Sequence, residues 1–152
     1  MNQPIVPISF RTMPRHSALI EADPMTRPAA KSPERSADIR RFAEEAARLL
    51  KDDKCEDVVL LDVRGVSPMT DFILIGTGTS DRQMRSAMNH LEELAAEQGV
   101  PPYRRGTDED AIWLVCDFID LVVHLFEPNA RAHYDIESLW HDARPVAWER
   151  EG

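Results

Sequence analysis

The amino-acid sequence predicts a single α/β domain, in which a mixed β-sheet is flanked by helices. Segments with apolar residues at helical spacing alternate with short runs rich in valine, leucine and isoleucine. Their order is helix, strand, strand, helix, strands, helix. Two of the strands follow each other closely enough to form a hairpin. This order is typical of a sheet with both directions of pairing, packed against helices.

The predicted domain covers residues 36–148, and the flanking segments differ from it in composition. Residues 1–35 hold six of the eleven prolines and no glycine, without a helical or alternating apolar pattern. We expect a disordered N-terminal extension there. Two other interpretations stay open: an organelle transit peptide, and a start of translation at Met13 or Met25. Residues 149–152 are expected to form a short C-terminal tail.

Two helices are predicted in the first two thirds of the domain. Ser36 is expected to cap a helix that runs to about Asp52 and buries one apolar stripe. Ser80 and Gln83 form a capping box at the start of the second helix. Gly99 is expected to end that helix.

A third helix is predicted from about Ala130 to His141, with Asn129 as its cap. Its buried side is expected to hold Tyr134, Ile136, Leu139 and Trp140. The end of the chain, including Pro145 and Trp148, is expected to lie along the surface.

The strands are predicted from short β-branched or apolar runs bounded by turn residues. The run at 72–75 is apolar throughout, so we expect it to be covered on both faces. The strands are expected at residues 57–63, 72–75, 103–105, 112–117 and 121–126.

The charge of the chain is unevenly distributed. The net charge is −9, but residues 1–35 carry five basic and three acidic side chains, which is +2. The remainder carries 13 basic and 24 acidic side chains, which is −11. Such a domain repels bare nucleic acid and favours a basic partner, although solubility alone also explains an acidic surface. Two cysteines are too few for a disulfide framework, so a cytoplasmic location is expected, and no membrane-spanning segment is predicted.

The turn Gly76-Thr77-Gly78-Thr79 leads from a strand into a helix, as phosphate-binding loops do. A dinucleotide-binding fingerprint would need glycine where Asp81 lies, and a Walker loop would need a Gly-Lys-Ser/Thr sequence that is missing. Asp81 and the capping groups of Ser80 and Gln83 already use the positive end of the helix. These features favour a helix N-terminus whose amides bond to the chain's own side chains over a phosphate site.

The sequence does not predict a catalytic or metal site. The acids Asp108-Glu109-Asp110 could hold metal ions only if a strand fixed them, and they lie in a predicted loop. Cys116 and His124 are not part of a ligand cluster, so zinc is not expected. We therefore predict no catalytic residues, no metal and no cofactor.

The predicted hairpin carries a candidate protein-binding patch. Alternation places Ile112, Leu114 and Cys116 on one face of its first strand, and Trp113, Val115 and Asp117 on the other. A tryptophan with aliphatic neighbours and a rim of acids is typical of a protein interface. The alternative, that helices cover both faces and Trp113 belongs to the core, stays open.

The chain resembles the ribosomal silencing factor family, also called the Iojap family. The resemblance covers about residues 37–148, and its motifs become specific through their order and spacing. The motifs are 61–64 (LDVR), 70–72 (TDF), 76–83 (GTGTSDRQ), 113–117 (WLVCD), 120–126 (DLVVHLF) and 131–140 (RAHYDIESLW).

The resemblance implies a translation repressor without enzymatic activity. Members of the family bind the large ribosomal subunit through a basic ribosomal protein on its intersubunit face, and they block joining of the small subunit when nutrients are scarce. Their fold is similar to that of nucleotidyltransferases without the catalytic carboxylates, and free members are often homodimers. A sequence-specific nucleic-acid partner is not implied. Two alternatives stay open: a large-subunit assembly factor using the same surface, and a reduced nucleotidyltransferase using Gly78, Ser80, Asp108 and Asp110.

The resemblance also implies which residues bind the partner. Trp113 matches the family tryptophan at the ribosomal-protein contact, and Val115, Asp117 and Asp120 are its expected neighbours there. Tyr134, Glu137, Leu139 and Trp140 match a last-helix motif that we interpret as structural. This chain departs from the family pattern at Ile119, where glycine is usual, and at Arg105, where glutamate is usual. The first departure affects the geometry of the turn before Asp120.

Overall fold

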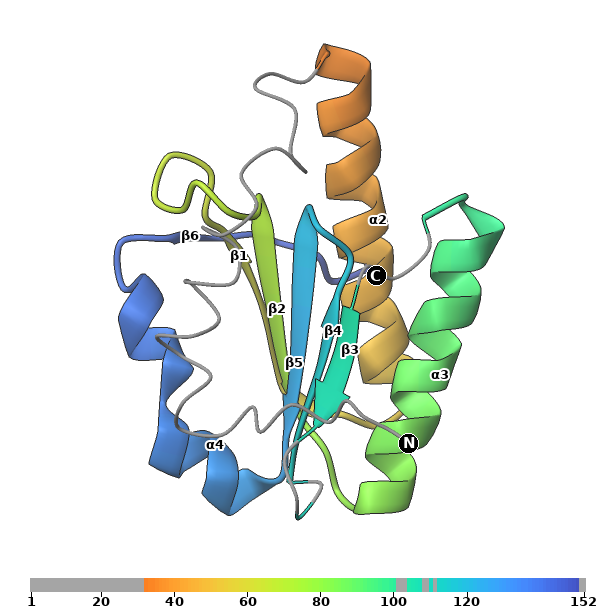
Figure 1. The fold of residues 1–152 in the computed structure, drawn as a ribbon, viewed down its shortest axis with the longest axis vertical. Coiled ribbons are helices and arrows are strands. Elements are labelled where there is room, and N and C mark those ends of the chain that lie inside the picture. Colours follow the sequence, from red (N-terminus) through yellow and green to blue (C-terminus); the bar gives the residue numbers. More distant parts are fainter. Residues whose placement is uncertain (1–31, 101–103, 108–109, 111, 151–152) are drawn as a thin grey trace.

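A computed structural model of the protein describes residues 32–100, 104–107, 110 and 112–150. These residues form one six-stranded sheet with helices on both faces, so the predicted fold class is confirmed. Figure 1 shows α2 and α3 together on one side of the sheet and α4 with the following segment on the other.

Helix α2 (Pro33–Asp52) begins earlier than its apolar stripe predicted. The Ser32 hydroxyl accepts a hydrogen bond from the Arg35 amide at 3.1 Å, and Pro33 occupies the first helical position, where its missing N–H costs nothing. Ser36 therefore lies inside the helix and is not its cap, and residues 33–35 are helical instead of belonging to the extension. Residues 1–31 of that extension lie outside the described residues.

Helix α3 (Asp81–Glu97) has the predicted start and end. Ser80 caps it by accepting a hydrogen bond from the Gln83 amide at 3.0 Å. Gly99 follows the helix with a φ of +74°, a left-handed conformation that glycine adopts without strain. The buried side of α3 is made of Met84, Ala87, Met88, Leu91 and Ala95. Together with the apolar stripe of α2, it packs against the sheet.

The sheet has the strand order β3-β4-β5-β2-β1-β6. The β2 and β5 strands pair in parallel and the other neighbours pair antiparallel, which confirms a mixed sheet. All of β2 is buried, as its continuous apolar run predicted. The strands are β1 (Glu56–Asp62), β2 (Phe72–Thr77), β3 (Arg104–Thr107), β4 (Trp113–Asp117), β5 (Leu121–Phe126) and β6 (Arg144–Pro145).

The predicted third helix is two shorter elements. Helix α4 (Pro128–Tyr134) is capped by Glu127, not by Asn129, and the 3-10 helix η2 (Ile136–Trp140) follows it. Asp135 lies between them with a φ of +44°, a left-handed conformation that interrupts the α-helical hydrogen bonds. As a result Leu139 is 52% exposed, so the prediction that it is buried was wrong.

The C-terminal segment was predicted to lie along the surface, and this prediction is wrong for Trp148. The β6 strand pairs with β1, and Trp148 is 8% exposed within the core beneath α2. Arg48 donates a hydrogen bond from Nε to the Trp148 carbonyl oxygen at 2.6 Å, which fixes the end of the chain to α2. Pro145 is exposed, so the expectation for that residue is confirmed.

Candidate partner-binding surface

The glycine turn between β2 and α3 is closed by its own hydrogen bonds. The Gly78 amide donates to the Phe126 carbonyl oxygen at 2.7 Å, and the Thr79 amide donates to Gln83 Oε1 at 2.9 Å. Gln83 also donates from Nε2 to the Asp53 carbonyl oxygen at 2.8 Å. The amides of Gly78 and Thr79 are among the donors that a phosphate at this turn would use.

Gly78 is required by packing. A Cβ at this position would lie 2.0 Å from Met84 Cγ, closer than any real contact between carbon atoms, and Met84 is fully buried. The turn passes so near α3 that only a hydrogen fits between them. The glycine therefore has a structural cause that involves no ligand.

The described residues contain no group of three or more histidine, cysteine or acidic side chains placed to hold a metal ion. Of the candidate acids, Asp108 and Glu109 lie outside the described residues, and Asp110 belongs to a turn. Burial raises the pKa of the Cys55 thiol to about 11 and raises the pKa of Cys116 further, so both remain protonated at neutral pH. Neither thiol has the properties of an activated nucleophile.

Trp113 is 0% exposed, between the sheet and α4. Its ring stacks on Phe126 with centroids 4.9 Å apart and contacts Tyr134 at 4.8 Å. Its Nε1–H donates to His124 Nδ1 at 3.1 Å, which leaves the histidine proton on Nε2. This placement agrees with the alternative in which Trp113 belongs to the core, because a fully buried ring is not accessible to a partner in this conformation.

The other three predicted contact residues are also buried, although not completely. Val115 and Asp117 are each 7% exposed and Asp120 is 8% exposed. Trp113 pairs with Phe126 at one end of β4, whereas Asp117 pairs with Val122 at the other. Four residues of strand separate the two ends by roughly 13 Å. The structure thus divides the predicted patch into a tryptophan end near α4 and an acidic end at the β4–β5 turn.

The β4–β5 turn is organised by its two aspartates. Asp117 Oδ1 accepts a hydrogen bond from the Ile119 amide at 2.7 Å. Asp120 Oδ2 accepts one from Arg35 Nη2 at 3.2 Å, while the Asp120 carbonyl oxygen accepts from the amides of Asp71 and Phe72. Because Arg35 belongs to the first turn of α2, this ion pair joins the turn to the start of the domain.

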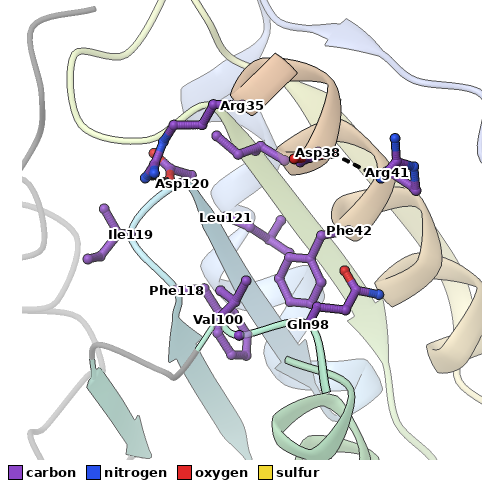
Figure 2. Close-up of a pocket in the computed structure, with 12 residues that line it drawn as sticks. Arg35, Asp38, Arg41, Phe42, Gln98, Val100, Phe118, Ile119, Asp120 and Leu121 are labelled. Carbon is purple, nitrogen blue, oxygen red and sulfur yellow. Dashed lines mark hydrogen bonds and ion pairs between the residues drawn. The ribbon is translucent and has the colours of Figure 1, made fainter. Parts of the chain in front are cut away.

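A pocket of about 660 Å³ opens beside this turn, as shown in Figure 2. Its apolar lining comes from α2, from the segment after α3 and from the turn, and includes Phe42, Val100, Phe118 and Leu121. Charged side chains border it: Arg35 pairs with Asp120, and Arg41 donates to Asp38 at 2.9 Å. An apolar floor with a charged rim is the arrangement found at protein interfaces.

Two arginines of structural importance were not identified from the sequence. Arg35 was assigned to the extension, because no motif marks it. Arg131 is 13% exposed; it forms a paired contact with Glu137 and donates to Thr77 Oγ1 at 2.8 Å. It also donates to the Asp57 carbonyl oxygen at 2.6 Å, so α4 is fastened to the ends of β1 and β2. Its place in the motif at 131–140 was the available signal, but spacing alone did not give these partners.

None of the helices in the described part of the chain is long and apolar enough to cross a membrane.

Comparison with known proteins gives one family. Residues 36–151 match the family model described as "Ribosomal silencing factor during starvation". A relative from Halalkalibacterium halodurans, named ribosomal silencing factor RsfS, is 39% identical over 104 residues, which are 68% of this chain and 89% of the relative.

Two further proteins extend the comparison. A mouse relative, named "Mitochondrial assembly of ribosomal large subunit protein 1", is 32% identical over 95 residues, which are 60% of this chain and 42% of that protein. A crystal structure of a protein from Chromobacterium violaceum matches with a TM-score of 0.64 at 28% identity, over 74% of this chain and 93% of that one.

Proposed function

Because the chain belongs to the ribosomal silencing factor family, we propose that it binds the large ribosomal subunit and sterically blocks joining of the small subunit. The match of residues 36–151 to the family model is the observation that carries this proposal. No covalent bond is made or broken in such a mechanism: the bound domain occupies space that the small subunit needs.

The proposed partner is a basic ribosomal protein on the intersubunit face. The excess of acids in residues 36–152, 24 against 13 basic side chains, supports this choice because opposite charge speeds encounter and selects the partner. Asp120, Asp117 and Val115 are the proposed contact residues, at or near the β4–β5 turn. Trp113 is proposed to act by positioning β4 from the other end, since its ring is buried.

A role without enzymatic activity is supported by the glycine turn. The amides of Gly78 and Thr79 donate to the protein's own groups, and Gly78 is explained by its packing against Met84. We place the protein in the cytoplasm, associated with ribosomes, and we propose that the free chain is a homodimer, as the family resemblance implies.

Light scattering of subunit joining tests the proposal directly. Purified small and large subunits are mixed with and without the protein, and we expect the rate and extent of joining to fall as the protein is titrated. Sedimentation should find the protein with the large subunit. An unchanged joining rate at saturating protein would refute the steric mechanism.

A second candidate is a large-subunit assembly factor. The name of the mouse relative is the observation that favours it, although that protein is only 42% covered by this chain. Depletion in growing cells separates the two roles. Immature large subunits would accumulate if assembly were the main role, whereas a silencing factor would leave them mature and change joining during starvation.

A further inference from the structure

The turn that joins β4 to β5 contains a residue in an unusual conformation. Ile119 has a φ of +75°, in the left-handed region, where a β-branched side chain is strained. The surrounding hydrogen bonds hold it there: its amide donates to Asp117 Oδ1, and the Phe118 amide donates to the Leu121 carbonyl oxygen at 2.8 Å. Glycine would adopt the same turn without strain.

Packing in the core does not account for the isoleucine. Ile119 is only partly buried, whereas its neighbours Phe118 and Leu121 are 3% and 1% exposed. Its side chain contributes to the lining of the 660 Å³ pocket described above. A strained residue that contributes little to core packing is expected to have another role, such as contact with a ligand or partner.

The border of the pocket carries two exposed ion pairs that a partner can open. Its two carboxylates, Asp38 and Asp120, are each paired with an arginine of this chain, and the arginine side chains are 62% and 53% exposed. Ion pairs of that exposure are weak, so cations of a partner can replace Arg41 and Arg35. The acidic excess of the domain also attracts a basic partner.

We infer that the pocket between the first turns of α2, the end of α3 and the β4–β5 turn receives an apolar side chain of the basic ribosomal protein, and that Ile119 is the residue that selects it. This inference rests on the proposed function and deepens it. The strain at Ile119 is retained because the side chain completes the apolar floor when the partner is bound.

Substitution of Ile119 tests the inference in the full chain. Asparagine tolerates the left-handed conformation but is polar, so Ile119→Asn should weaken binding to purified large subunits at least about fivefold without lowering Tm. Ile119→Gly should weaken binding to a similar extent. Ile119→Val keeps a β-branched apolar side chain and should bind within about twofold of the wild type.

A matched control removes strain elsewhere. Lys54 has a φ of +74°, is exposed, and lies in the connection between α2 and β1. Lys54→Gly should leave subunit binding unchanged, which separates loss of the Ile119 side chain from a general effect of backbone relaxation.

The possible outcomes are distinct. Failure of the wild type to bind large subunits refutes the proposed function. Wild-type binding together with equal binding by Ile119→Asn overturns this inference alone, as does a fall in Tm of several degrees, which would give Ile119 a role in the core. If Ile119→Asn changes the monomer–dimer equilibrium but not subunit binding, the pocket receives a second copy of the chain and the inference is wrong.

Discussion

Two turns of this sheet differ in whether contacts within the folded chain explain their residues. The glycine turn between β2 and α3 has the sequence of a ligand-binding loop, yet its amides bond to Phe126 and Gln83, and the packing of α3 explains its glycine. The β4–β5 turn carries no recognised ligand motif, yet it contains a strained Ile119 and borders a pocket. A local sequence pattern therefore indicates a site only when folding leaves its residues unexplained.

The largest expected effect concerns the far end of β4. Trp113→Ala removes a fully buried ring that stacks on Phe126 and donates to His124. We expect the free energy of unfolding to fall by about 3–5 kcal/mol, measured by urea denaturation. Trp113→Phe, which keeps the stacking but loses the donor, should cost about 1–2 kcal/mol.

Binding to large subunits gives the second measurement for these variants. The folded fraction of Trp113→Phe should bind as the wild type does, because the buried ring is proposed to support β4 and not to contact the partner. If Trp113→Ala were nearly as stable as the wild type but no longer bound large subunits, Trp113 would be shown to contact the partner.

The next effect tests the glycine turn. Gly78→Ala places a methyl group against Met84 Cγ, and we expect a loss of about 1–3 kcal/mol because the methionine must change rotamer. The loss should shrink in a Met84→Ala background, which has room for the added methyl group; a double-mutant cycle measures the difference. Stabilisation of the wild type by a nucleotide with Mg²⁺ in a thermal-shift assay would contradict a purely structural turn.

A smaller effect is expected at the start of α2. Arg35→Ala removes a half-exposed partner of Asp120, so stability should change by less than about 1 kcal/mol. Affinity for large subunits should rise about twofold to fivefold at low salt, because the cation that competes for the carboxylate is gone. The gain should diminish as salt is added.

Arg40→Ala is the matched control for Arg35. It removes a similarly exposed arginine of α2 that pairs with Glu44 at 2.9 Å and does not line the pocket. Equal effects of the two substitutions on binding would show that net charge, and not the pair at the β4–β5 turn, is responsible.

The smallest expected effect concerns the exposed hydrogen bond between His90 and Asp53. Hydrogen bonding to Asp53 at 2.6 Å raises the pKa of His90 above its usual 6.5. The folded state therefore binds the proton more tightly, and this stabilisation is complete below about pH 6.5 and is lost as pH rises through the folded pKa. Because His90 is 45% exposed, less than about 1 kcal/mol is expected.

Urea denaturation between pH 5.5 and 9 provides the measurement, with His90→Asn as the reference. The stability difference between wild type and variant should decrease with rising pH, and a difference that grew would contradict the assignment.

Patterns that depend on one element were predictable from the sequence. The alternation in β4 separated Leu114 and Cys116 from Trp113 and Val115, as the two apolar clusters confirm. Ile112, which was expected beside Leu114, packs against the cluster of Trp113 instead, because β4 begins only at Trp113. The capping box at Ser80 was equally local, since its partners are three residues apart. Periodicity and spacing are sufficient where chain neighbours determine the outcome.

Features that depend on contacts between distant elements were not predictable. The break at Asp135 requires a left-handed residue that no turn motif indicated. Trp148 packs in the core, and its carbonyl oxygen accepts a hydrogen bond from Arg48, a hundred residues earlier. The same is true of the ion pair between Arg35 and Asp120. The division of the predicted patch into two ends likewise appeared only when the register of β4 and β5 was known.

The short β6 strand has a consequence for how the chain can be shortened. It covers the outer edge of β1, where the Val146 amide donates to the Leu60 carbonyl oxygen at 2.8 Å, and Trp148 closes the core behind it. Truncation before Arg144 would uncover a strand edge beside apolar side chains, and such edges recruit strands of other molecules. Residues 144–148 thus protect the edge of β1, and versions of the protein shortened before Arg144 are expected to precipitate before they lose their secondary structure.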